Sequence, residues 1–154
     1  MSSETSVLYD ERLNVPLRWW VQATMFLATV WLAFIVALPP ALAWGATGVL
    51  TGAVVALFLG YGAARVRVDG GVFQAGPARI PVAMLADPVA LDAEATRLLA
   101  GRDANAHAYL LLRPYLKRAV RVEVTDPADP VPYWLVSTRR PEELAAALVV
   151  AGSQ

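Results

Sequence analysis

Few side chains in this sequence can do chemistry, and their spacing matches no catalytic pattern. His107 is the only histidine, and it lies in a polar stretch, residues 102–108, that is typical of a surface loop. A Ser/His/Asp arrangement with Ser137 is conceivable, but no G-x-S-x-G sequence surrounds that serine. The chain has no cysteine, which excludes thiolate catalysis, disulfides and cysteine-bound zinc. We therefore interpret His107 as a solvated residue and predict no catalytic residue.

The acidic residues that stand close together have structural explanations. Asp92 is a good N-cap for a helix, and Glu94 lies in the first turn, where the helix dipole favours a negative charge. Asp126 and Asp129 belong to a turn-rich stretch and could hold a hard cation, but calcium requires six or more oxygen ligands. No glycine-rich phosphate-binding loop is present. We predict neither a metal site nor a cofactor.

One basic cluster stands out in the second half of the chain. Four positive charges fall within nine residues, at Arg113, Lys117, Arg118 and Arg121. Close to an anionic membrane surface, each such charge contributes about 1 kcal/mol to attraction. The functional interpretation is contact with anionic lipid headgroups or with a partner protein, and the alternative is an ordinary solvated hairpin with acidic partners. The near-zero net charge of the chain disfavours nucleic-acid binding.

Two adjacent aromatic residues follow this cluster. Tyr133 and Trp134 face opposite sides if they lie on a strand, so one is expected in the core and the other exposed. Pro132 before them indicates an edge strand. We add Trp134 to the candidate lipid- or partner-binding residues, with core packing as the alternative.

The charges are distributed in a way that predicts a membrane anchor. All 26 charged residues of the 154 lie in residues 1–18 and 65–154, and residues 19–64 carry none. Residues 19–38 and 41–64 are each long enough to cross a bilayer as a helix. Pro39 and Pro40 between them end the first helix. The prediction is a cytoplasmic N-terminal segment (1–18), a transmembrane hairpin (19–64, turn at 39–40) and a cytoplasmic domain (65–154).

Basic residues at the hairpin ends predict its orientation. Arg12 and Arg18 precede the first span, Arg65 and Arg67 follow the second, and the turn carries no Lys or Arg. Because cytoplasmic flanks are enriched in positive charge, both termini are expected in the cytoplasm of a bacterial inner membrane.

Aromatic residues at the span ends agree with this orientation. Trp19, Trp20 and Tyr61 fall near the inner interface and Trp44 near the outer one. A cleavable secretory signal is the alternative, since residues 41–43 have the A-x-A form, but the apolar stretch is long and acidic residues precede it.

Small residues recur along both spans. Gly48, Gly52, Ala56 and Gly60 are spaced by four residues, and the first span offers Thr29, Ala33 and Ala37 at the same spacing. This spacing lets helix backbones approach closely. Two interpretations stay open: packing within the hairpin, and self-association or docking to another membrane protein. The absence of ionisable residues from both spans disfavours a transporter.

The remaining 90 residues read as a small α+β domain. Alternating or continuous apolar runs bounded by turn residues predict strands, and apolar residues at helical spacing predict helices. The expected strands are 65–68, 72–75, 79–82, 109–112, 120–124 and 133–137, and the expected helices are 92–100 and 138–150. An antiparallel β domain closed by a C-terminal helix has the outline of a pleckstrin-homology-like domain.

Three motifs resemble a known family. They are YDERL at residues 9–13, LDAEATR at 91–97 and DPADPVPYWLVSTRRP at 126–141. They are similar to motifs of an actinobacterial family of small two-span membrane proteins that carry a domain of unknown function. The resemblance covers nearly the whole chain and implies a bacterial inner-membrane protein, and the family brings no activity, cofactor or catalytic residue. The C-terminal part resembles bacterial pleckstrin-homology-like domains over a shorter stretch.

These observations predict a non-enzymatic inner-membrane protein. Its partners are the lipid bilayer and, through the cytoplasmic domain, anionic lipid headgroups or a protein. One alternative is an accessory subunit of a larger membrane complex, docked through the Gly48, Gly52 and Ala56 face. Another is an enzyme acting on an envelope lipid, which would need a polar pocket near Arg65, Arg113 and Asp92.

Overall fold

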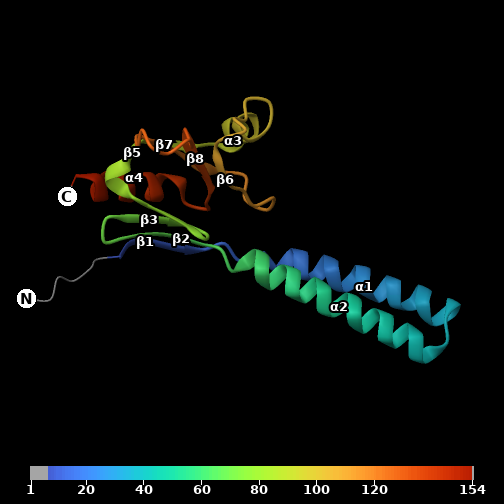
Figure 1. Ribbon diagram of the computed structural model, residues 1–154. Coiled ribbons are helices and arrows are strands. Elements are labelled where there is room, and N and C mark those ends of the chain that lie inside the picture. Colours follow the sequence, from blue (N-terminus) through green and yellow to red (C-terminus); the bar gives the residue numbers. More distant parts are fainter. Residues whose placement is uncertain (1–6, 154) are drawn as a thin grey trace, which may run out of the picture. The chain divides into compact units, whose positions relative to one another are not determined.

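The computed structural model describes residues 7–153 and divides them into two compact units. One unit is helical and comprises residues 14–63. The other combines residues 7–13 with residues 64–153, so its chain is interrupted by the helical unit (Figure 1).

The helical unit is a pair of long apolar helices. Helix α1 is Leu17–Ala37 and helix α2 is Pro40–Gly62. Pro40 occupies the first turn of α2, where its missing N–H is not needed, and the two prolines limit the connection to two residues. With mean hydropathies of 1.8 and 1.9, both helices are long and apolar enough to cross a membrane. The two predicted spans thus form as helices, with bounds shifted by one or two residues.

Aromatic pairs fix how α1 and α2 pack. The Trp20 ring meets the Phe58 ring edge-on at 5.0 Å, and the Trp31 and Trp44 rings lie 5.3 Å apart. Because the beginning of α1 meets the end of α2 and the end of α1 meets the beginning of α2, the helices run antiparallel.

The glycines of α2 do not make this contact. A Cβ atom added at Gly48, Gly52 or Gly60 would meet nothing within 4 Å, and Ala56 is exposed. Thr29, Ala33 and Ala37 of α1 are exposed as well. The interpretation that the small residues pack within the hairpin is therefore wrong. Phe58 faces α1 instead, and Gly60 stands about 200° around the helix from it.

The first sheet of the domain, sheet A, joins both chain segments. Its strands are β1 (Val7–Arg12), β2 (Arg65–Asp69), β3 (Val72–Ala75) and β4 (Ala78–Pro81), in that spatial order and all antiparallel. Gly70 and Gly71 have positive φ in the turn between β2 and β3, and Gly76 has positive φ in the next turn. The structure thus divides the chain differently from the prediction, because residues 7–12 are a strand of the domain rather than a separate segment.

The second sheet, sheet B, contains one parallel pair. It is formed by β5 (Leu85–Leu91), β6 (Tyr109–Leu111), β7 (Ala119–Val124) and β8 (Tyr133–Ser137), in the spatial order β5-β7-β8-β6. Strand β6 runs parallel to β8, while the other pairs are antiparallel. The expectation of an all-antiparallel sheet is therefore wrong. The cause is helix α3 (Ala93–Ala100), which connects β5 at one edge of the sheet to β6 at the other edge. Such a crossover lets β6 run in the same direction as β5.

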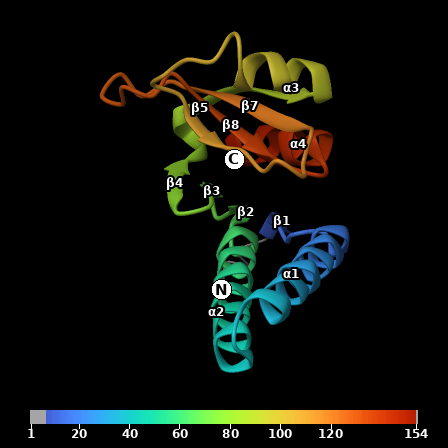
Figure 2. The ribbon, with the colours of Figure 1, turned by 90° about the vertical axis from the view of Figure 1, so that its right-hand side faces the viewer.

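Helix α4 (Pro141–Gly152) packs against both sheets, as Figures 1 and 2 show. Its Leu144 and Leu148 join a core that Val68 and Phe73 enter from sheet A and Trp134 from sheet B. A 3-10 turn, η1 (Val82–Met84), leads from sheet A to sheet B. A second, smaller core lies on the other side of sheet B, where Leu99 packs with Tyr133 and Leu135. The domain is thus α+β, and its likeness to pleckstrin-homology-like domains stays a prediction.

Candidate anionic-ligand surface

The residues considered for nucleophilic catalysis do not form a triad. His107 is exposed, and its backbone N–H donates to Asn105 Oδ1 at 2.9 Å. Ser137 is fully buried, and its Oγ accepts a hydrogen bond from the Arg113 backbone N–H at 3.1 Å. Ser137 therefore fixes the chain after β6 rather than meeting a substrate.

The acidic residues take the structural roles expected of them. Asp92 caps α3 by accepting from the Ala95 N–H at 2.8 Å. Asp126 accepts from Ala128 N and Asp129 from Val131 N, each at 2.9 Å, which are turn contacts. Among residues 7–153 no group of three or more His, Asp and Glu side chains is placed to hold a metal ion.

The predicted basic cluster is divided among different partners. Arg118 pairs with Glu142 at 3.3 Å and donates to the Arg139 carbonyl. Arg121 pairs with Glu123 at 2.6 Å and lies over the Tyr133 ring. Arg113 Nη1 donates to the Leu112 carbonyl, and Lys117 is exposed. Acidic partners were the alternative interpretation for this cluster, and Arg118 and Arg121 have them.

Trp134 is a core residue. Only 5% of it is exposed, and its ring lies 4.6 Å from that of Tyr109 and 5.7 Å from that of Phe73. Tyr133 is buried on the other face. The expectation that one of the two is exposed is wrong, because β8 lies between β7 and β6 rather than at an edge, and both faces of sheet B are covered.

The membrane-interface candidates fall at the ends of the elements. Trp19 and Trp20 begin α1 and contact Phe58 near the end of α2, and Tyr61 lies close to the α2 C-terminus. Trp44 begins α2, and Arg18 lies in the first turn of α1. Arg65 and Arg67 belong to β2. Their depth in a bilayer stays a prediction.

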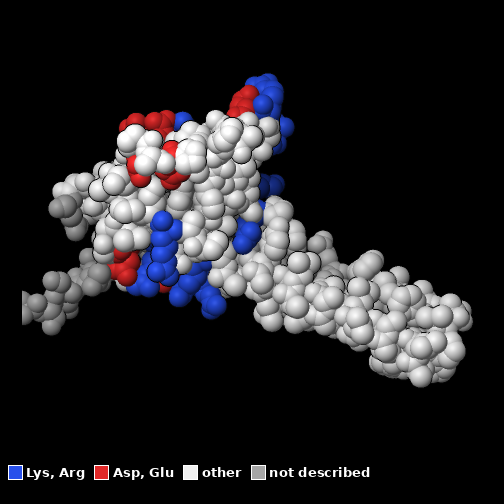
Figure 3. All heavy atoms as spheres, viewed as in Figure 1, with Lys and Arg blue, Asp and Glu red and all other residues white. Residues whose placement is uncertain are grey.

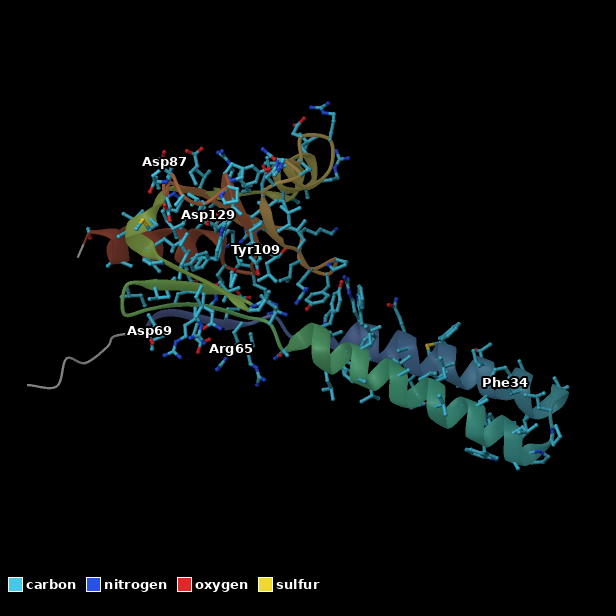
Figure 4. All side chains as sticks on the ribbon, in the orientation of Figure 1. Phe34, Arg65, Asp69, Asp87, Tyr109 and Asp129 are labelled. Atoms are coloured by element: carbon cyan, nitrogen blue, oxygen red, sulfur yellow. The ribbon has the colours of Figure 1, made fainter. Side chains whose placement is uncertain are left out.

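A basic surface that the sequence analysis missed covers the outside of sheet A. Alternation buries Val66, Val68 and Phe73, which leaves polar residues on the opposite face. One cross-strand row reads Asp10, Arg67, Gln74, Arg79 across the four strands, and the next pairs Arg12 with Arg65. We call Arg12, Arg65, Arg67 and Arg79 the arginine face. The basic residues gather along the lower side of the domain in Figure 3, where Figure 4 labels Arg65.

The arginine face keeps an excess of positive charge. Arg65 forms an ion pair with Asp10 at 3.5 Å, and Arg67 forms one with Asp69 at 2.6 Å. The side chains of Arg12 and Arg79 have no acidic partner within residues 7–153. Acidic residues such as Asp87 and Asp129 lie on the opposite side of the domain (Figure 4). On the arginine face, four arginines thus stand against two aspartates, Asp10 and Asp69.

A shallow hollow of about 230 Å³ lies within the arginine face. Its lining is Arg67, Asp69, Val72, Gln74 and Arg79. The Gln74 amide nitrogen donates to the Gly76 carbonyl at 3.1 Å, which leaves its oxygen as an acceptor. The hollow thus offers guanidinium donors beside amide and carboxylate acceptors.

A buried carboxylate holds β1 in the domain. Glu11 is 6% exposed and accepts from the Tyr9 and Thr138 hydroxyls, both at 2.6 Å. It also accepts from the backbone N and Nη1 of Arg139 at 3.2 and 3.3 Å. Tyr9, Glu11 and Leu13 are all buried, at every second position of the chain. This period of two is the pattern in the sequence that indicates a strand. Two of the motifs noted in the sequence, residues 9–13 and 126–141, therefore meet at one point.

Burial changes the acidity of two tyrosines in the domain. Desolvation, reinforced by the hydrogen bond to Glu11, raises the pKa of Tyr9 well above its ordinary value. Burial also raises the pKa of Tyr109, whose hydroxyl donates to the Ala75 carbonyl at 2.8 Å. Both hydroxyls therefore stay protonated at neutral pH and act as structural donors.

Comparison with known proteins gives a family. No curated protein and no solved structure matches the chain. A family model described as "Protein of unknown function (DUF3093)" matches residues 8–148, which include most of β1, both long helices and the first two thirds of α4. The match covers most of the chain, and the protein therefore belongs to the DUF3093 family.

Proposed function

We propose that this protein is an integral membrane protein of the bacterial inner membrane, with α1 and α2 crossing the bilayer as a hairpin. The two uncharged helices and their two-residue connection support this arrangement. Arg12, Arg18, Arg65 and Arg67 flank the hairpin ends, and the connection carries no charge. By the positive-inside rule, both termini and the domain lie in the cytoplasm.

The domain binds anionic lipid headgroups through the arginine face. The observation that carries this proposal is the excess of arginine over acid on the outer surface of sheet A. Arg65 follows the end of α2 by three residues and Arg12 precedes α1 by five, so the covalent chain ties these two arginines to the ends of the proposed spans. Three residues span at most about 11 Å. The cytoplasmic leaflet is anionic, so these charges favour its headgroups.

The proposed role is binding rather than catalysis. His107 is exposed in a loop, and Ser137 is occupied as a structural acceptor. The buried carboxylate of Glu11 is hydrogen-bonded to neighbouring donors rather than open to a substrate. The alternative of an enzyme acting on an envelope lipid would need a polar pocket near Arg65, Arg113 and Asp92.

The test measures the lipid that the full chain retains after purification in a neutral detergent. Arg67→Gln/Arg79→Gln removes two charges of the arginine face while keeping Arg12, Arg18 and Arg65 for topology. At about 1 kcal/mol for each charge, the affinity for anionic lipid should fall about 30-fold.

A matched variant controls for net charge. Arg118→Gln/Arg121→Gln also removes two charges, but from residues paired with Glu142 and Glu123. This variant should retain anionic lipid within about threefold of the wild type, because Arg118 and Arg121 lie outside the arginine face. Equal losses in both variants, or no loss in either, would contradict the proposal.

A second candidate function is that of an accessory subunit in a larger membrane complex. It is favoured by the open space around Gly45, Gly48, Gly52 and Gly60, which leaves a smooth face on α2. Replacing Gly52 by Leu fills that face without touching α1. The variant should release a co-purifying membrane protein or a second copy of the chain if this face is a docking surface. An unchanged complex would count against it.

A further inference from the structure

We propose that the hollow in the arginine face is a specific site for the phosphodiester of a polyol headgroup, such as glycerol phosphate. This inference rests on the proposed binding of anionic lipid and names the headgroup class. It differs from a general attraction between the arginine face and an anionic surface, because one phosphate group would be bound by particular side chains.

The strand register places two arginines on either side of one glutamine. Arg67 of β2, Gln74 of β3 and Arg79 of β4 are consecutive partners in one row. Neighbouring strands are about 4.8 Å apart, so the two arginine backbones are separated by roughly 10 Å. Guanidinium groups on side chains of this length can both reach an anion above Gln74, and each offers a fork of donors that fits phosphate oxygens.

The charge of the hollow matches a single negative charge. Arg67 and Arg79 contribute two positive charges, and Asp69 contributes one negative charge. A phosphodiester carries one negative charge and would neutralise the site. A phosphomonoester carries about 1.5 to 2 negative charges at neutral pH and would leave the occupied site with a net negative charge next to Asp69.

The lining also offers hydrogen-bond acceptors for a ligand with hydroxyl groups. Arg67 and Asp69 are joined by one short contact, Nη2 to Oδ2, while Arg67 Nε and Asp69 Oδ1 are without a hydrogen-bond partner within residues 7–153. Both side chains keep part of their surface exposed, at 37% and 26%. Because the terminal torsion of an aspartate is soft, Oδ1 can turn toward a bound hydroxyl. The Gln74 oxygen is a second acceptor, and Val72 offers an apolar wall for the carbon chain.

The experiment titrates the full chain in neutral detergent with two short-chain lipids. Phosphatidylglycerol presents a phosphodiester with hydroxyls, and phosphatidic acid presents a monoester without them. The wild type should bind phosphatidylglycerol at least tenfold more tightly. Water-soluble glycerophosphoglycerol serves as a third probe, and its competition at the same residues would identify the headgroup rather than the acyl chains as the ligand.

Three substitutions test the geometry. Arg79→Gln should weaken phosphatidylglycerol binding at least tenfold, and Arg79→Lys should recover only part of it because lysine lacks the fork. Arg65→Gln, on the same face outside the hollow, should weaken it no more than about fivefold, the effect of one charge near the surface. Asp69→Asn removes the negative charge, so phosphatidic acid should bind about tenfold better and the preference for glycerol should disappear.

The outcomes separate this inference from the proposed function. The specific site would be overturned if both lipids bound equally well and Arg79→Gln weakened phosphatidylglycerol binding no more than Arg65→Gln. The proposal of general binding to anionic lipid would be unaffected by that result. Lipid retention unchanged in Arg67→Gln/Arg79→Gln would overturn both. Loss of the preference for phosphatidylglycerol in Asp69→Asn, through tighter binding of phosphatidic acid, would support the site directly, since loss of folding cannot tighten binding.

Discussion

Removal of the Glu11 carboxylate should destabilise the domain strongly, although Glu11 lies before the hairpin in sequence. In Glu11→Ala, four hydrogen-bond donors lose their acceptor. Two of them can find others, because the Tyr9 and Thr138 hydroxyls lie 2.8 Å apart and the Arg139 guanidinium is partly exposed. One hydroxyl then stays buried without an acceptor, and the part-buried Arg139 backbone N–H loses its bond to Glu11.

The expected loss follows from these two donors. Each unsatisfied buried group costs about 1 to 3 kcal/mol. The Arg139 side chain is 42% exposed, so the loss of Glu11 leaves no buried charge unpaired and the broken ion pair adds little. We therefore expect a loss of about 2 to 4 kcal/mol in the free energy of unfolding, and for a domain of this size the melting temperature should fall by at least about 8 °C.

The assay follows the β-sheet band in the infrared spectrum during heating, because every strand within residues 7–153 belongs to the domain and none to the hairpin. Glu123→Ala is the control, since it breaks an exposed ion pair with Arg121 and should cost less than about 1 kcal/mol. Glu11→Gln keeps the shape and should give an intermediate loss. If Glu11→Ala lost no more stability than Glu123→Ala, the assignment of Glu11 as the residue holding β1 in place would be refuted.

Two further predictions concern the same domain. Tyr9 has a raised pKa in the folded state, so its contribution to stability should be constant below its unfolded pKa of 10.0 and fall as the pH rises beyond it. The melting temperature should therefore decline above pH 10 more steeply in the wild type than in Tyr9→Phe, where the raised pKa of Tyr109 leaves a smaller decline, and parallel curves would contradict the prediction. Gly76→Ala should destabilise by about 1 to 2 kcal/mol, because Gly76 has φ of 62° and a Cβ there would lie 3.3 Å from Leu111 Cδ1. Gly71→Ala, at φ of 73° in open space, should cost less in denaturant titration, and equal losses would show that the Leu111 contact is unimportant.

Much of the fold was accessible from local sequence patterns. The Pro39-Pro40 break, the Asp92 cap and the alternation around Val122 each specify their element through nearby residues, and the structure has a helix or strand at each. The last helix begins at Pro141 rather than Thr138, because Thr138 instead donates to Glu11 and accepts from Arg140 N.

What the sequence did not reveal depends on contacts between distant segments. Strand β1 is separated from β2 by the hairpin, so its pairing cannot be read from adjacent turns. The arginine face draws one or two residues from each of β1, β2 and β4, whereas a linear scan favours four basic residues close together, such as those from Arg113 to Arg121. Strand β5 was missed because Asp87, with φ of 47°, and Pro88 interrupt its pattern at a bulge.

The claim on which the others depend is that the hairpin crosses the membrane with the domain in the cytoplasm. The chain has no cysteine, so single cysteines at Leu38, at the turn, and at Lys117, in the domain, can be labelled in intact cells with a membrane-impermeant maleimide. We predict that Leu38→Cys is labelled in intact cells and that Lys117→Cys is labelled only after the membrane is made permeable. Labelling of Lys117→Cys in intact cells, or protection of both cysteines, would contradict this arrangement.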